Sequence, residues 1–146
     1  MTFLTPQQIF DKVATHLMTQ GKQAHNERNE CVYRGLGGTS CAMGCLIPDE
    51  CYDQGMEDRK FFPTDEPGMR TGTAVSEKFP EALVAAGIDA SNAQVRRLCR
   101  HLQCGVHDLS IWDSESTVDT WVKALKATAL LFHLSITNVP QLQGAL

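Results

Sequence analysis

The sequence predicts an α+β fold: a mainly helical single domain with three principal helices and a short β-hairpin around residues 31–47. Two observations carry this prediction. Three segments repeat apolar residues at helical spacing behind recognisable N-caps, and a glycine-rich stretch between them joins two runs with β-leaning chemistry. A chain of 146 residues is long enough to bury one core, so residues 1–146 are taken as one globular domain.

The first predicted helix starts after Thr5 and stops at Gly21. Thr5 and Gln8 have the spacing of a capping box, and Pro6 suits the first helical turn. Its apolar face repeats at three- and four-residue steps through Ile9, Phe10, Val13 and Leu17.

The hairpin prediction comes from CVYRGLGGTSCAMGCLIPDECYD, residues 31–53. Residues 31–33 favour a strand, GLGG can turn the chain, and SCAMGCLI can return it. The next stretch, residues 54–73, is rich in glycine, proline and charge and is predicted to be a long mobile loop.

Two further helices are predicted in the second half. Ser91 and Gln94 form a second capping box before a stripe made by Val95, Leu98, Cys99, Leu102 and Val106. Ser116 and Asp119 open the last helix, whose apolar face is Val118, Trp121, Val122, Leu125, Ala129 and Phe132. These two helices and the first one are expected to form the core.

Composition excludes some classes of protein. The net charge of −4 argues against nucleic acid as the main partner, because that role needs clustered cations. No segment approaches the apolar length of a membrane span, and the N-terminus lacks the pattern of a secretory signal, so a cytoplasmic location without membrane partners is expected. A homo-oligomer is left open, because the apolar termini MTFL and VPQLQGAL fit burial within one subunit or between two.

Four of the six cysteines lie close together in the sequence and raise the question of zinc: Cys31, Cys41, Cys45 and Cys51. Their intervals differ from the paired knuckles of structural zinc sites, and reduced cysteine is often a small buried residue. No metal and no cofactor are therefore predicted, and a zinc-stabilised structural module is kept as an alternative.

Catalysis is the other alternative. Cys41 or Cys45 could act as a nucleophile with His107, since a cysteine nucleophile needs a histidine beside it. The sequence holds no hydrolase elbow, HExxH or zinc-deaminase motif. Binding is therefore expected in preference to catalysis.

The segment YRGLGG suggests where a ligand binds. Glycines let backbone amides surround an anion, Arg34 offers a forked donor, and Tyr33 offers a ring for stacking. The predicted ligand-binding residues are Tyr33, Arg34, Gly35, Gly38, Asp49 and Glu50. The competing interpretation is a turn in which Arg34 pairs with Asp49 or Glu50.

The chain resembles a group of uncharacterised small proteins of bacteria and phages. They share a C-x-YRG-x-x-G-x-x-CA-x-GCLIPDE-x-Y element, matched here by residues 31–52, and a later LQ-x-x-HD element, to which LQCGVHD is similar but one residue longer. The resemblance implies a phage or mobile-element accessory protein. Together with the YRG loop, it leads to the expectation that the chain modulates a host defence process by binding a host protein or sequestering a small nucleotide-like signal.

Overall fold

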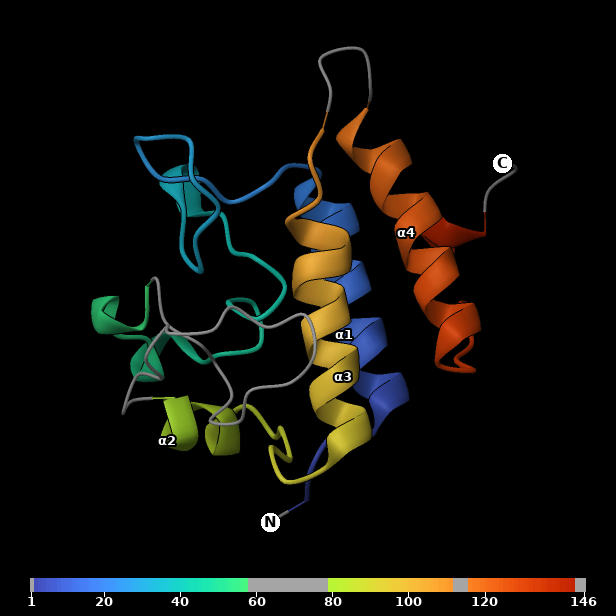
Figure 1. The fold of residues 1–146 in the computed structure, drawn as a ribbon, viewed down its shortest axis with the longest axis horizontal. Coiled ribbons are helices and arrows are strands. Elements are labelled where there is room, and N and C mark those ends of the chain that lie inside the picture. The colour runs from blue at the N-terminus through green and yellow to red at the C-terminus, as the bar shows by residue number, and fades with distance from the viewer. Residues whose placement is uncertain (1, 58–78, 112–115, 144–146) are drawn as a thin grey trace.

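The described part of the chain is helical (Figure 1). The computed structural model describes residues 2–57, 79–111 and 116–143. Its α-helices are α1 (Pro6–Gln20), α2 (Phe79–Ala85), α3 (Ala93–Leu102) and α4 (Thr117–Leu131), and a π-helical turn, Gln103–His107, continues α3. Short 3-10 turns lie at Leu36–Gly38, Asp49–Cys51, Gln54–Met56 and Pro140–Leu142. Among the described residues, no helix has the length and apolar character needed to cross a membrane.

The three longest helices correspond to the three predicted ones, because their start signals are local. Thr5 accepts the amide of Gln8 at 3.1 Å, and the Gln8 side chain accepts the amide of Thr5 at 2.9 Å, which closes the capping box of α1. Gly21 then ends α1 in the left-handed conformation, with φ 72°.

The start of α3 differs from the prediction by one residue. Asn92, not Ser91, is the cap, and its Oδ1 accepts the amides of Gln94 and Val95. Ser116 caps α4 as predicted, by accepting the amide of Asp119.

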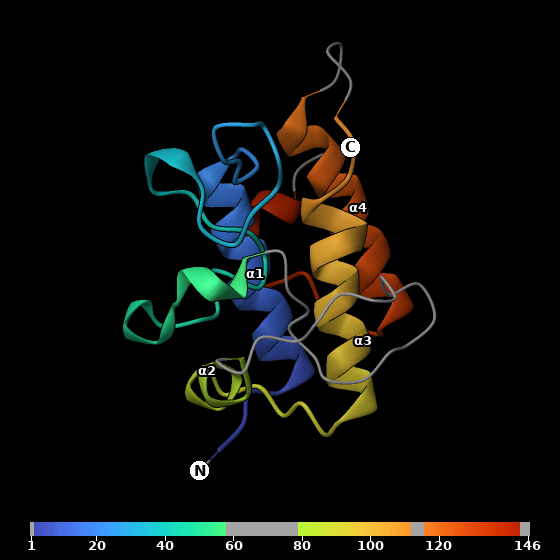
Figure 2. The ribbon, with the colours of Figure 1, turned by 60° about the vertical axis from the view of Figure 1, so that its left-hand side comes forward.

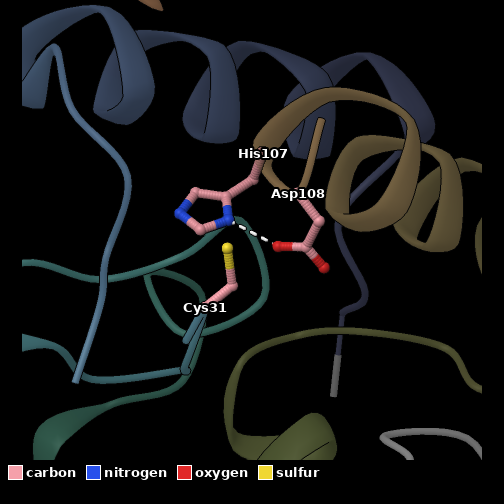
Figure 3. A group of neighbouring side chains, drawn as sticks. All are labelled: Cys31, His107 and Asp108. Carbon is pink, nitrogen blue, oxygen red and sulfur yellow. Dashed lines mark hydrogen bonds and ion pairs between the residues drawn. The ribbon is translucent and has the colours of Figure 1, made fainter. Parts of the chain in front are cut away.

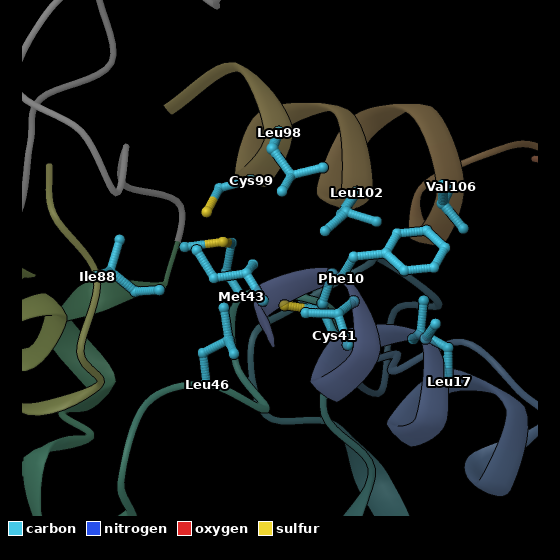
Figure 4. Close-up of a cluster of buried hydrophobic side chains, with 14 of the residues drawn as sticks. Phe10, Leu17, Cys41, Met43, Leu46, Ile88, Leu98, Cys99, Leu102 and Val106 are labelled. Carbon is cyan, nitrogen blue, oxygen red and sulfur yellow. The ribbon is translucent and has the colours of Figure 1, made fainter. Parts of the chain in front are cut away.

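Helices α1, α3 and α4 form the main helical layer, with α1 contacting both of the others (Figures 1 and 2). Residues 41–47 cover the other side of α1 and α3, so that Met43 and Leu46 face Leu98 and Cys99 across the core (Figure 4). Each fully buried large apolar side chain of this kind contributes about 1.5–3 kcal/mol to stability. The core therefore joins the cysteine-rich segment firmly to the helices.

The predicted β-hairpin around residues 31–47 is wrong. The described residues contain no β-strand or sheet, only two isolated bridges, His25 with Cys31 and Arg34 with Ser40. In a regular hairpin the Tyr33 amide would pair with the return strand, but a side chain from outside the segment, Glu57, accepts it together with the Arg34 amide.

The return segment also folds as turns and not as a strand. The Cys45 amide donates to the Cys41 carbonyl at 3.0 Å, as in one turn of helix. Gly44 lies so close to Tyr33 that a Cβ there would overlap the Tyr33 carbonyl oxygen. Smallness at this position allows the two backbones to pack directly on each other.

The predicted mobile loop over residues 54–73 lies mostly outside the described residues. Its described beginning is ordered: Gln54–Met56 form a 3-10 turn, and Met56 is buried in the core.

Candidate functional site

The predicted ligand loop is held by contacts within the chain. The Arg34 guanidinium forms an ion pair with Asp49 and donates to the Ile47 carbonyl at 2.7 Å. It also lies over the Tyr52 ring, 5.1 Å from the ring centre. These contacts are those of the competing interpretation, in which Arg34 braces a turn.

The other residues of the predicted site are spread around this turn. Gly38 adopts φ 76°, a conformation that suits glycine, and Glu50 is exposed. A Cβ on Gly35 would lie 2.7 Å from the His25 amide nitrogen, so glycine is needed there for close backbone approach. Ligand binding by the six residues stays a prediction.

A second cluster joins the start of the cysteine-rich segment, at Cys31, to the end of the LQCGVHD segment. Cys31, His107 and Asp108 bring a sulfur, a ring nitrogen and a carboxylate oxygen within 4.8 Å of one another (Figure 3). His107 is fully buried, whereas a third of the Asp108 side chain is exposed. The sequence alternative paired His107 with Cys41 or Cys45, but this group contains neither of them.

His107 is engaged at both ring nitrogens. Nδ1 lies 2.7 Å from Asp108 Oδ1, and Nε2 accepts the Ala24 amide at 3.0 Å. Because a backbone amide can only donate, Nε2 keeps its lone pair for it and the ring proton sits on Nδ1, facing the carboxylate. His107 therefore fastens the connector at residue 24 to the end of the π-helical turn.

Two glutamines complete this fastening. Gln103 donates to Asp108 Oδ1 at 2.9 Å and accepts the Met43 amide at 2.9 Å. Gln23 donates to the carbonyls of His107 and Leu109, at 2.6 and 2.7 Å. Satisfied buried polar networks of this kind fix one packing arrangement.

The π-helical turn sets the positions of these groups. Three residues, Cys104, Gly105 and Val106, separate Gln103 from His107. The Asp108 amide donates to the Gln103 carbonyl at 2.9 Å, an i→i−5 bond in place of the α-helical i→i−4 bond. This turn therefore holds one residue more than a turn of α-helix.

Cys31, Cys41 and Cys45 do not have the character of nucleophiles. Although Cys31 is exposed as a residue, partial burial of its thiol raises its pKa to about 11, aided by the charge of Asp108 and a hydrogen bond to it. Burial also raises the pKa of Cys45 to about 12 and holds the pKa of Cys41 well above its ordinary value. An activated cysteine needs the opposite shift, so these thiols stay protonated at neutral pH.

The chemistry of the cluster does not fit a metal ion. A ligating histidine normally binds through one ring nitrogen and donates the proton of the other to an acceptor. If His107 Nδ1 bound a metal, the proton would move to Nε2 and point at the Ala24 amide, which is itself a donor. The four cysteines of the zinc alternative also fail to gather: among the described residues, only Cys31 belongs to such a group.

An open pocket of about 590 Å³ lies beside the cluster. Its polar lining is contributed by the connector after α1 and by the chain after the π-helical turn, and includes Lys22, His25, Asn29, Cys31, Asp108 and Ser110. Lys22 is exposed, so its ammonium group is available to an anion. Ligand pockets commonly have volumes of about 300–1,000 Å³.

Sequence reasoning missed the most connected residues of the site. Gln23, Gln103 and Glu57 looked like ordinary polar residues, and Cys31 was weighed only as a zinc ligand. The LQCGVHD segment was the available signal, because it places Gln103 and His107 around one turn. Comparison with known protein families, curated proteins and solved structures found no match.

Proposed function

We propose that this chain is a small binding protein and that its ligand occupies the pocket beside Cys31 and Asp108. The observation that carries the proposal is the construction of the pocket. A ligand-sized opening is backed by a buried and satisfied network, while the thiol in its wall is held protonated. This combination suits recognition better than covalent chemistry.

The pocket chemistry supports a ligand with an anionic group and hydroxyl groups. Lys22 offers a cation for phosphate or carboxylate, and Asp108, Asn29 and Ser110 offer partners for hydroxyl or amine groups. A small nucleotide-like signal has both features. The resemblance to bacterial and phage proteins supports the further proposal that the ligand, or a host protein docked at the same place, belongs to a host defence process.

Isothermal titration calorimetry with mononucleotides, dinucleotides and cyclic nucleotides tests the proposal. At least one should bind, and Lys22→Ala should weaken that binding roughly tenfold, since a charge-assisted hydrogen bond is worth about 1.5–3 kcal/mol. Lys123→Ala is the matched control, because Lys123 is an exposed lysine on α4. If no nucleotide binds, or if both variants lose affinity equally, the assignment of the pocket is wrong.

A further inference from the structure

A second feature, which shares no residue with this pocket, is the environment of Glu57. Its carboxylate accepts the amides of Tyr33 and Arg34, at 2.9 and 3.2 Å, and the Tyr52 hydroxyl, at 2.7 Å. Three donors thus converge on one carboxylate. We call the two amides and the hydroxyl the carboxylate cradle.

The cradle is shaped by the turn that carries it. Consecutive backbone amides that point to the same side form an anion-binding concavity. Gly35 is extended and leads into the turn at Leu36–Gly38, and a Cβ there would lie 2.6 Å from Thr39 Oγ1 and 2.7 Å from the His25 amide nitrogen. Glycine therefore permits the close packing of the segment that follows the two amides.

The neighbouring charges and the third donor also favour an anion. The Arg34 guanidinium lies over the Tyr52 ring and places a positive charge beside the cradle, partly offset by its ion pair with Asp49. Burial and the hydrogen bond to Glu57 raise the pKa of Tyr52, so its hydroxyl remains a donor throughout the physiological range. Arg34 Nε is buried and has no hydrogen-bond partner within the described residues, so this residue retains unused donor capacity.

We propose that the amides of Tyr33 and Arg34 with the Tyr52 hydroxyl form a binding site for a ligand carboxylate, and that Glu57 fills this site as an internal competitor. The donors come from residues 33–52, whereas the carboxylate that they hold comes from residue 57. A ligand that presents a carboxylate binds by displacing the Glu57 side chain and taking the same three hydrogen bonds.

The internal competitor determines how the site must be tested. A tethered group acts at an effective concentration in the millimolar range or above. Free carboxylates should therefore compete poorly in the natural chain and bind well once Glu57 is removed. Glu57→Ala empties the cradle, and Glu57→Gln removes the charge while keeping the shape.

Thermal unfolding at pH 7 in sodium acetate, against sodium chloride of equal ionic strength, provides the assay. Glu57→Ala should unfold at a lower temperature than the natural chain, and acetate should raise its Tm by about 3–6 °C with saturation. The natural chain and Glu27→Ala, a control at an exposed glutamate, should change by less than about 1 °C. Adding Tyr52→Phe to Glu57→Ala should reduce the acetate effect, because one donor is lost.

Two further arms identify the source of the carboxylate. If N-acetylglutamate amide raises the Tm at lower concentration than acetate does, the ligand is an acidic side chain of a partner protein; equal potency indicates a small free acid. If inorganic phosphate raises the Tm of Glu57→Ala as acetate does, the site is not specific for carboxylates and the proposal is overturned.

Hydrogen exchange keeps the proposal testable if Glu57→Ala does not fold. The amides of Tyr33 and Arg34 should exchange faster in Glu57→Gln than in the natural chain, and acetate should slow them again. If acetate changes neither the Tm nor this exchange in any Glu57 variant, the cradle is only a structural contact of Glu57 and the proposal is refuted. That outcome would not affect the proposal about the pocket, which the nucleotide titration tests separately.

Discussion

Removing the charge of Asp108 should speed the alkylation of Cys31. The pKa of this thiol is raised from its ordinary value of 9.0 to about 11, first by burial and then by the charge of Asp108 and a hydrogen bond to it. A raised pKa means less thiolate at any pH below it, and the thiolate is the species that reacts.

The size of the effect follows from this shift. At pH 8, two pKa units lower the thiolate fraction roughly 100-fold. A more basic thiolate is also a better nucleophile. With a Brønsted coefficient of about 0.4–0.5, two pKa units make the thiolate itself roughly tenfold more reactive, which offsets part of the loss in thiolate fraction. Cys31 in the folded chain should therefore react roughly tenfold more slowly than in the unfolded chain. Its rate should rise tenfold per pH unit until the pH approaches about 11.

The assay is iodoacetamide labelling at pH 8 followed by peptide mass spectrometry, with the urea-denatured chain as the reference. Asp108→Asn retains an oxygen for His107 and Gln103 but removes the charge, so labelling of Cys31 should become several-fold faster without reaching the denatured rate. Asp53→Asn, the same change at an exposed residue, should leave it unchanged.

Two results would refute this reasoning. One is native labelling of Cys31 as fast as in the denatured chain, which would mean that its pKa is not raised. The other is slower labelling in Asp108→Asn, which would mean that the carboxylate activates the thiol, as a catalytic arrangement with His107 requires.

Three other predictions concern stability and metal content. Gln103→Leu should lower the free energy of unfolding by about 1–3 kcal/mol in urea titration, since the Met43 amide loses its buried acceptor; Gln94→Leu, the same change at an exposed position of α3, should change it by less than about 0.5 kcal/mol. Gly44→Ala should cost about 2 kcal/mol or more by the same measurement, because the added methyl group overlaps the Tyr33 carbonyl, and an unchanged midpoint would contradict the close backbone packing. Treatment with EDTA should leave the Tm unchanged, whereas a large fall with zinc in the released fraction would restore the zinc-module alternative.

The sequence predicted those parts of the fold that depend on near neighbours. The caps at Thr5 and Ser116 lie three residues from the amides they accept, and the apolar stripes repeat within single helices. The hairpin prediction was wrong because the deciding contact comes from a residue that is distant in the sequence. The Tyr33 amide donates to Glu57, which lies 24 residues away, and no local pattern marks that side chain as the competitor for a strand partner.

The candidate site was predictable only in fragments for the same reason. Ala24 and His107 are 83 residues apart, and their hydrogen bond exists only because α1 and α3 pack together. The residue types near the site were visible in the two motifs, but the pairing of Cys31 with Asp108 required the tertiary structure. The close backbone approach at Gly44 is of another kind, because glycine itself expresses that requirement in the sequence.

The π-helical turn has a consequence for how this chain can change in length. It confines an additional residue to one wide turn, so that the helix before it and the histidine and aspartate after it keep their relative placement. Deleting one residue between Gln103 and His107 would convert this turn to an ordinary α-helical one and leave the polar network in register. Single-residue insertions and deletions, which normally rotate every later side chain of a helix, can therefore be absorbed here, next to the most interconnected part of the molecule.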